Sequence, residues 1–155
     1  MSALKDTIVA DLTAAMKARD KTTTATLRML KAALQTEETS GAKHELTDAD
    51  VLKVVAREIK RRHESATVYS EAGRQELADA ELAEAGVLQR YQPAQLDDGE
   101  LTALVDRVIA EHESATGEPV TRAAMGKVMG AAKAAAAGRV DGKRLSDAVK
   151  ARLQG

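Results

Sequence analysis

The hydrophobic residues of the N-terminal half recur every three or four positions, which is the spacing of an amphipathic helix. One set follows Ser2, a good N-cap residue, and consists of Leu4, Ile8, Leu12 and Met16. A second set follows a break at residues 20–22 and consists of Leu27, Leu30 and Leu34. We find no convincing strand pattern, so the spacing predicts an antiparallel pair of helices.

A longer third helix is predicted to start at Thr47 and to continue to about Ala72. Its apolar stripe consists of Val51, Val55, Ile59, Ala66 and Tyr69. About 25 residues rising about 1.5 Å each would span roughly 37 Å, so we expect this helix to extend beyond the first two. A fourth helix is predicted between Arg74 and Tyr91, because Gly73 allows a turn and Pro93 stops a helix.

After Pro93 the pattern restarts on a smaller scale. Asp97 and Asp98 can cap a helix that ends at the Gly-Glu-Pro break of residues 117–119. A helix from about Thr121 to Ala137 follows, ended by Gly138 as a left-handed residue, and Asp141 is the predicted cap of a last helix over about 142–154. We therefore predict an all-α protein, with about four helices, one of them long, in a domain over residues 1–93. A small three-helix domain is predicted over residues 94–155.

The composition excludes several classes of site. The 155 residues include no Cys, which excludes thiolate metal sites, disulfides and cysteine nucleophiles. They include no Phe or Trp and only two Tyr, Tyr69 and Tyr91, so the sequence does not support modules that read bases by aromatic stacking. The sequence also has no run of eighteen apolar residues and no signal-peptide pattern at its N-terminus. We expect a cytoplasmic protein without membrane contact.

The sequence does not support catalysis by this chain. The three histidines lie in different predicted elements without zinc-pair spacing, and no nucleophile elbow or complete phosphate-loop motif occurs. We predict no catalytic residue, no metal site and no cofactor. A basic run in the third helix is a second candidate surface, although most such runs are solvated faces that pair with nearby acids; it consists of Lys53, Arg57, Lys60, Arg61 and Arg62.

The charges are distributed unevenly along the chain. The net charge is −1, yet residues 122–155 contain eight Lys or Arg against two Asp, a local charge of +6. Such a basic end can contact nucleic acid, whereas the alternative is that alanine-rich helices carry charges for solubility. The candidate nucleic-acid-binding residues are Arg122, Lys127, Lys133, Arg139, Lys143 and Arg144.

Glycines interrupt this same basic segment. Gly126 and Gly130 fall on one strip of the predicted helix with Arg122, Lys133 and Ala137, within roughly 80° on a helical wheel. Either a neighbouring helix packs closely against the strip, or an RNA backbone approaches it. The last helix opens with Gly142, Lys143 and Arg144, where unpaired amides and the helix dipole favour an anion. The close-approach glycines are therefore Gly126, Gly130 and Gly142.

Several motifs of the chain are similar to those of one protein family. The most specific are Met125-Gly126-Lys127-Val128-Met129, Gly138-Arg139 and Asp141-Gly142-Lys143. Weaker ones are Leu27-Arg28-Met29-Leu30, Glu64-Ser65, Tyr69, Ala72-Gly73-Arg74, Leu88, Tyr91, Pro93 and Gln95-Leu96. Over nearly its full length the chain resembles the GatB/YqeY family, the small standalone relatives of the C-terminal tail of the B subunit of bacterial glutamyl/aspartyl-tRNA amidotransferase.

The resemblance implies a function as well as an all-α fold. The corresponding amidotransferase tail helps to hold tRNA, and the catalytic parts lie elsewhere in that complex. The resemblance therefore implies a non-catalytic helical module of translation, associated with tRNA-dependent amidation, that contacts tRNA or amidotransferase subunits. A protein-binding adaptor without RNA affinity is the alternative. The third possibility is carbon–nitrogen ligase activity with glutamine as amido-N-donor, exerted only as part of a complex.

Overall fold

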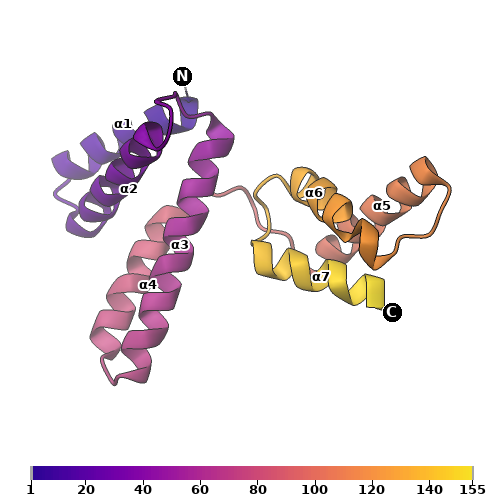
Figure 1. Ribbon diagram of the computed structural model, residues 1–155. Helices are drawn as coiled ribbons and strands as arrows, with labels where there is room; N and C mark the ends of the chain where they lie inside the picture. Colours follow the sequence, from indigo (N-terminus) through magenta and orange to yellow (C-terminus); the bar gives the residue numbers. More distant parts are fainter. Residues whose placement is uncertain (1, 155) are drawn as a thin grey trace. The chain divides into compact units, whose positions relative to one another are not determined.

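The computed structural model describes residues 2–154, in which the regular structure is seven α-helices and one short 3-10 helix, with no strand (Figure 1). The predicted all-α class is confirmed. Contacts divide the chain into two compact units, Met1–Gln92 and Pro93–Gly155. That these units are separate domains, divided after residue 93, stays a prediction.

The first unit contains four helices: α1 (Ala3–Lys17), α2 (Lys21–Thr39), α3 (Asp48–Glu71) and α4 (Gln75–Gln89). The first three begin at a side-chain cap, whereas α4 follows Arg74 without one. The Ser2 hydroxyl accepts from the Lys5 amide at 3.1 Å, and Thr47 forms a capping box with Asp50 at the start of α3. The side chain of Asp20 caps α2. Each cap satisfies an amide that the helix leaves unpaired, which fixes where these helices begin.

The core of the first unit is built from the predicted stripes. Its buried side chains are Ile8, Leu12, Leu27, Leu30, Leu34, Leu46, Val51, Val54, Val55, Ile59, Val87 and Leu88. Met16 was expected in the α1 stripe but is 42% exposed, because Ala15 takes the buried position in the last turn. The Met16 sulfur instead lies 3.4 Å from a guanidinium nitrogen of Arg28 on α2.

The two helices α3 and α4 form an antiparallel arm that extends beyond α1 and α2, as expected from the length of α3 (Figure 1). Alanines at positions 66, 78 and 85 are buried along the arm. Three members of the basic run are exposed and pair with nearby acids, as expected: Arg57 with Glu37, Lys60 with Glu64, and Arg61 with Glu58, of which Glu58 is buried. Arg62 corrects the expectation of a solvated face, since it is only 2% exposed.

The second unit contains α5 (Asp98–Thr116), the 3-10 helix η1 (Arg122–Ala124), α6 (Met125–Ala136) and α7 (Gly142–Gln154). Asp97 caps α5 and forms a capping box with Glu100, and the left-handed Gly117 ends α5. The Asp141 carboxylate accepts from the Arg144 amide at 2.8 Å, which confirms the predicted cap of α7.

The helix predicted from Thr121 to Ala137 is shorter in the structure. Thr121 is extended, with φ −115° and ψ 172°, and the 3-10 turn that follows delays the α-helix to Met125. At the other end Ala137 is already left-handed, with φ 48°, ahead of the predicted Gly138, with φ 80°. The strip proposed from the sequence therefore loses Arg122 and Ala137 at its ends, and within α6 it consists of Gly126, Gly130 and Lys133.

The core of the second unit joins all three of its α-helices. The buried residues are Leu96, Leu101, Leu104, Val105, Val108, Val128, Ala132, Ala136, Leu145 and Val149. The segment before α5 is attached to the α6–α7 loop, because the Leu96 amide donates to the Arg139 carbonyl at 2.8 Å. Within residues 2–154 no helix has the length and apolar character needed to span a membrane.

Candidate nucleic-acid interface

Arg144 is one of the six predicted cations, and the structure turns its guanidinium toward its own unit. It donates to Asp98 Oδ1 at 2.8 Å and to the Leu96 carbonyl at 3.1 Å. These contacts tie the first turn of α7 to the start of α5. Because its guanidinium donates to groups of its own unit, Arg144 has a structural role.

Arg139 is likewise engaged within the unit. Its guanidinium donates to the carbonyls of Ala136 and Ala135, at 3.0 and 3.2 Å. These carbonyls belong to the last turn of α6, where a cation also interacts favourably with the negative end of the helix dipole. Arg139 therefore caps α6, and the predicted set of six separates into two structural arginines and four other cations.

The other four predicted cations are exposed: Arg122, Lys127, Lys133 and Lys143. None of them forms a hydrogen bond or ion pair with any residue in the described range, 2–154. Lys150 has the same properties but was not among the predicted residues. Its position seven residues after Lys143 could have indicated it, since residues two helical turns apart share a face.

We call the exposed side of α6 its outer face; it carries Gly126, Lys127, Gly130, Ala131, Lys133 and Ala134. A Cβ atom added to either glycine would meet no atom within 4 Å. The opposite side of α6 is the one that packs, through Val128, Ala132 and Ala136. The interpretation of these glycines as close-packing positions against a neighbouring helix is therefore wrong for the helices of their own unit.

Lysines flank the open glycines on the outer face. At about 100° per residue, Lys133 lies about 20° to one side of Gly126 and Lys127 about 100° to the other. Glycine inside a helix costs roughly 0.5–1 kcal/mol relative to alanine. Gly130 incurs this cost without a packing contact in return, and it leaves the helix backbone accessible between two cations.

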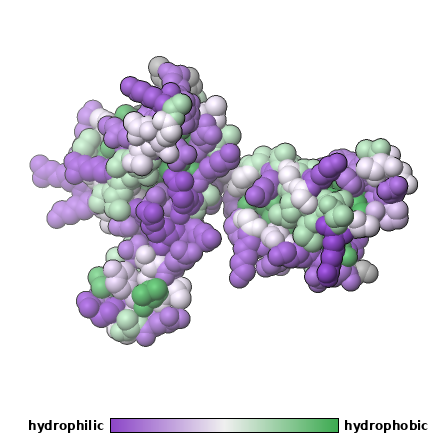
Figure 2. Space-filling model, viewed as in Figure 1, coloured by the Kyte–Doolittle hydropathy of each residue, from purple (hydrophilic) through white to green (hydrophobic). Residues whose placement is uncertain are grey.

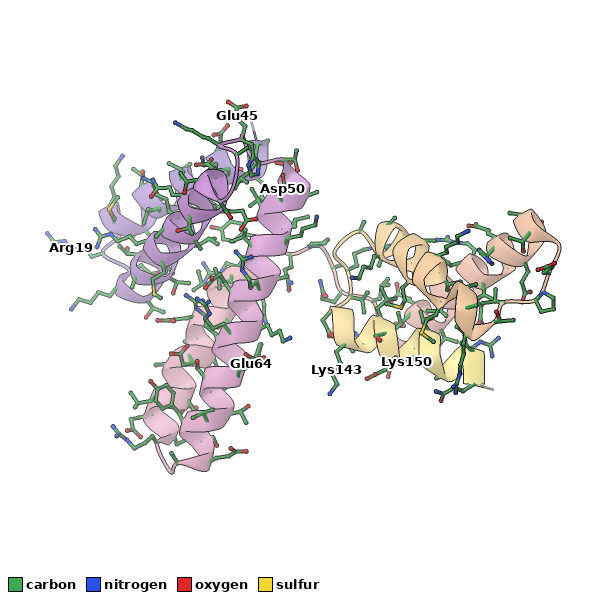
Figure 3. The ribbon with its side chains drawn as sticks, viewed as in Figure 1. Arg19, Glu45, Asp50, Glu64, Lys143 and Lys150 are labelled. Atoms are coloured by element: carbon green, nitrogen blue, oxygen red, sulfur yellow. The ribbon has the colours of Figure 1, made fainter. Side chains whose placement is uncertain are left out.

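The predicted residues do not all lie on one helix. Arg122, Lys127 and Lys133 belong to η1 and α6, whereas Lys143 lies in the first turn of α7 and extends away from α6 (Figure 3). Gly142 is also open, with no atom within 4 Å of an added Cβ. The Arg144 amide already donates its hydrogen bond to the Asp141 carboxylate. Lys143 is thus the cation at the start of α7 that remains available to a ligand.

The Asp97 carboxylate, which caps α5, has a lowered pKa that favours its charged form. The backbone N–H of Glu100 donates to the Asp97 carboxylate at 2.7 Å and is the main cause that lowers the pKa of Asp97, with a smaller contribution from the charge of Arg144.

A pocket of about 450 Å³ between α5 and α7 contains Asp106 and Arg152, which pair with each other. No cluster of three or more His, Cys, Asp or Glu that could hold a metal ion occurs in the described part of the chain.

Comparison with protein families identifies the chain. The family model described as YqeY-like protein matches residues 5–153, nearly the whole sequence. The chain belongs to the YqeY-like family. The match includes all of α2–α6 and therefore every residue of the outer face of α6, so this surface is part of the YqeY-like sequence and not an appended segment. No curated protein matches the chain.

Proposed function

We propose that this YqeY-like protein is a non-catalytic helical module that contacts folded RNA, in particular tRNA, through the exposed cations of α6 and α7. The observation that carries the proposal is the outer face of α6. Lys127 and Lys133 are exposed and unpaired within residues 2–154, beside two glycines that leave the helix backbone open. No packing contact of the fold accounts for this combination.

The chemistry of this surface suits a phosphate backbone. Contacts to phosphates need cations and donors but no aromatic ring, and they carry no sequence information of their own. Each phosphate that a Lys or Arg neutralises releases counterions, so the affinity should depend strongly on salt. We therefore expect recognition of backbone and shape rather than reading of bases.

The resemblance to the GatB/YqeY family supports the part of the proposal that assigns this contact to translation, near tRNA-dependent amidation. In this proposal the chain holds tRNA, or holds it against amidotransferase subunits, and carries out no transfer step alone. Carbon–nitrogen ligase activity with glutamine as amido-N-donor would then belong to a complex. Incubation of misacylated tRNA and glutamine with the chain alone should give no amidated product, whereas amidation by the chain alone would overturn this part of the proposal.

The main proposal is tested by measuring the affinity of the chain for tRNA at two salt concentrations. Fluorescence anisotropy of labelled tRNA at about 50 mM and about 200 mM salt should show binding that weakens steeply with salt. The triple variant Lys127→Gln, Lys133→Gln, Lys143→Gln should bind more weakly. Lys43→Gln, an exposed lysine of the α2–α3 loop, is the matched control and should bind as the wild type does. Absence of binding at about 50 mM salt would overturn the proposal.

A protein-binding adaptor is the second candidate, and a separate observation favours it. Val68 and Leu82 are 64% and 44% exposed on the α3–α4 arm, where Figure 2 shows hydrophobic surface. Exposed apolar side chains of this size are common at protein interfaces. Recovery of the same protein partner before and after nuclease treatment, lost on Val68→Ser with Leu82→Ser, would favour the adaptor over the RNA-binding module.

A further inference from the structure

Five cations lie around the α1–α2 turn in the first unit. We call them the turn cluster; its members are Lys17, Arg19, Lys21, Arg28 and Arg90. All five are exposed. Lys17 lies in the last turn of α1 and Arg19 in the turn itself. Lys21 begins α2, Arg28 lies two turns further along α2, and Arg90 is the residue after α4.

Specific contacts bring these elements together. The guanidinium of Arg28 lies 3.4 Å from the Met16 sulfur, which places Arg28 against the last turn of α1. The Tyr91 hydroxyl donates to Asp11 at 2.7 Å and so holds the end of α4, with Arg90, against α1. Arg90 is close enough to Asp20 in the turn for its charge to add to the hydrogen bonds from Thr23 that lower the pKa of this carboxyl.

The positive charge of the turn cluster is not neutralised by the fold. None of the five cations forms an ion pair with any residue between 2 and 154. The carboxylate within the turn, Asp20, is engaged as the cap of α2, where it accepts from the Thr23 amide at 3.1 Å and the Thr23 hydroxyl at 2.7 Å. The cluster therefore presents more positive than negative charge to solvent.

Arg19 adds an independent observation, because its backbone is left-handed, with φ 57°. The Arg19 amide donates to the Met16 carbonyl at 3.2 Å, and the Asp20 amide donates to the Ala15 carbonyl at 3.0 Å. This is the hydrogen-bond pattern of a Schellman motif. Glycine adopts this conformation without steric cost, whereas an arginine is strained there. The strained position presents a cationic side chain that extends away from the helices (Figure 3).

We infer that the turn cluster is a second phosphate-contacting surface, for the backbone of the same class of folded RNA. This inference rests on the proposed function and deepens it by giving the first unit a share in RNA binding. Five cations without an ion pair among residues 2–154, three of them in α1 and α2, match the dense, repeated charge of an RNA backbone. Protein surfaces intersperse carboxylates with cations and seldom offer a block of negative charge of this density.

The first test is the salt dependence of tRNA binding by the variant Lys17→Gln, Lys21→Gln, Arg28→Gln. The slope of log affinity against log salt is negative, and each lost contact should reduce its magnitude by roughly 0.7–0.9. For three lost contacts the slope should become shallower by roughly 2.1–2.7. Lys43→Gln again serves as the control. An unchanged slope would overturn the inference, and so would a variant that binds RNA normally but no longer binds an acidic protein.

Arg19→Gly separates binding from folding. The change relieves the left-handed strain, so we expect a higher melting temperature together with at least threefold weaker binding of tRNA. Unchanged binding would contradict a role for Arg19.

The two proposals fail in different ways. If only the α6–α7 triple variant weakens binding, the turn cluster is refuted and the proposed function stands. If the wild type binds no RNA, both are refuted. If only the turn-cluster variant weakens binding, the inference holds and the assignment to α6 and α7 is wrong.

Discussion

The guanidinium of Arg144 lies 2.8 Å from the Asp98 carboxylate and links the start of α7 to the start of α5. Asp98 is almost fully exposed, so the ion pair itself contributes little, and the hydrogen bond to the Leu96 carbonyl contributes more. Arg144→Ala should lower the unfolding free energy by about 1–2 kcal/mol, measured by urea denaturation.

Lys143 provides the matched control for this prediction. It precedes Arg144, is exposed and has no ion pair within residues 2–154, so Lys143→Ala should change stability by less than about 0.5 kcal/mol. At a temperature where both variants are folded, Lys143→Ala should weaken tRNA binding more than Arg144→Ala does. The reverse order would contradict the structural role assigned to Arg144.

Arg62 and Glu58 form a buried ion pair within α3. The guanidinium donates to the Glu58 carboxylate at 2.8 Å, and it also donates to Glu84 on α4 at 3.2 Å. Glu58 is 5% exposed, so Arg62→Ala would leave a carboxylate buried without its main partner. We expect a loss of about 3–5 kcal/mol in chemical denaturation. Arg61→Ala removes an arginine whose side chain is 70% exposed and should cost less than about 0.5 kcal/mol; equal losses would contradict the assignment.

At Gly130 we predict a substitution that stabilises the fold. It lies in the interior of α6 with open space where a Cβ would be, so Gly130→Ala should raise the unfolding free energy by about 0.5–1 kcal/mol. The same change at Gly117, with φ 73°, should destabilise because alanine is strained there. Thermal unfolding of both variants checks the pair. Destabilisation by Gly130→Ala would mean that the outer face of α6 is packed after all.

The carboxylate that caps α5 should make part of the folding stability depend on pH. The pKa of Asp97 is lowered in the folded state, chiefly by the Glu100 amide, so the folded chain binds this proton less readily than the unfolded chain does. Its contribution is therefore present above a pH of about 4 and is lost as the pH falls through the lowered pKa. Asn caps a helix without titrating. Asp97→Asn should thus lose less stability between pH 7 and pH 3 than the wild type in urea titrations; an equal loss would assign the acid sensitivity to other carboxylates.

Much of the helical framework could be predicted from local sequence. The caps Ser2, Thr47, Asp97 and Asp141 lie where the pattern placed them, because capping depends on residues three positions apart. The 3-10 turn before α6 was missed, since only the extended backbone at Thr121 delays that helix. Local pattern thus indicated the helices well and one of their boundaries poorly.

The site was less accessible to sequence analysis than the framework. Arg139 and Arg144 carry the same charge as Lys127 and Lys133, and only tertiary contacts show that the arginines are engaged. The solvent-facing position of Gly130 depends on which side of α6 packs on the core. Four members of the turn cluster lie within residues 17–28, so the sequence shows most of its charge, and only the tertiary contacts show that Arg90 lies near the same turn.

The most direct test of the central claim is lysine footprinting of the protein with and without tRNA. An amine-reactive label read by mass spectrometry reports the accessibility of each lysine separately. The account predicts that tRNA protects Lys127, Lys133 and Lys143 from the label, while Lys43 reacts equally in both samples. Equal labelling of all four lysines under conditions where tRNA is bound would contradict the claim that the outer face of α6 and the start of α7 contact RNA.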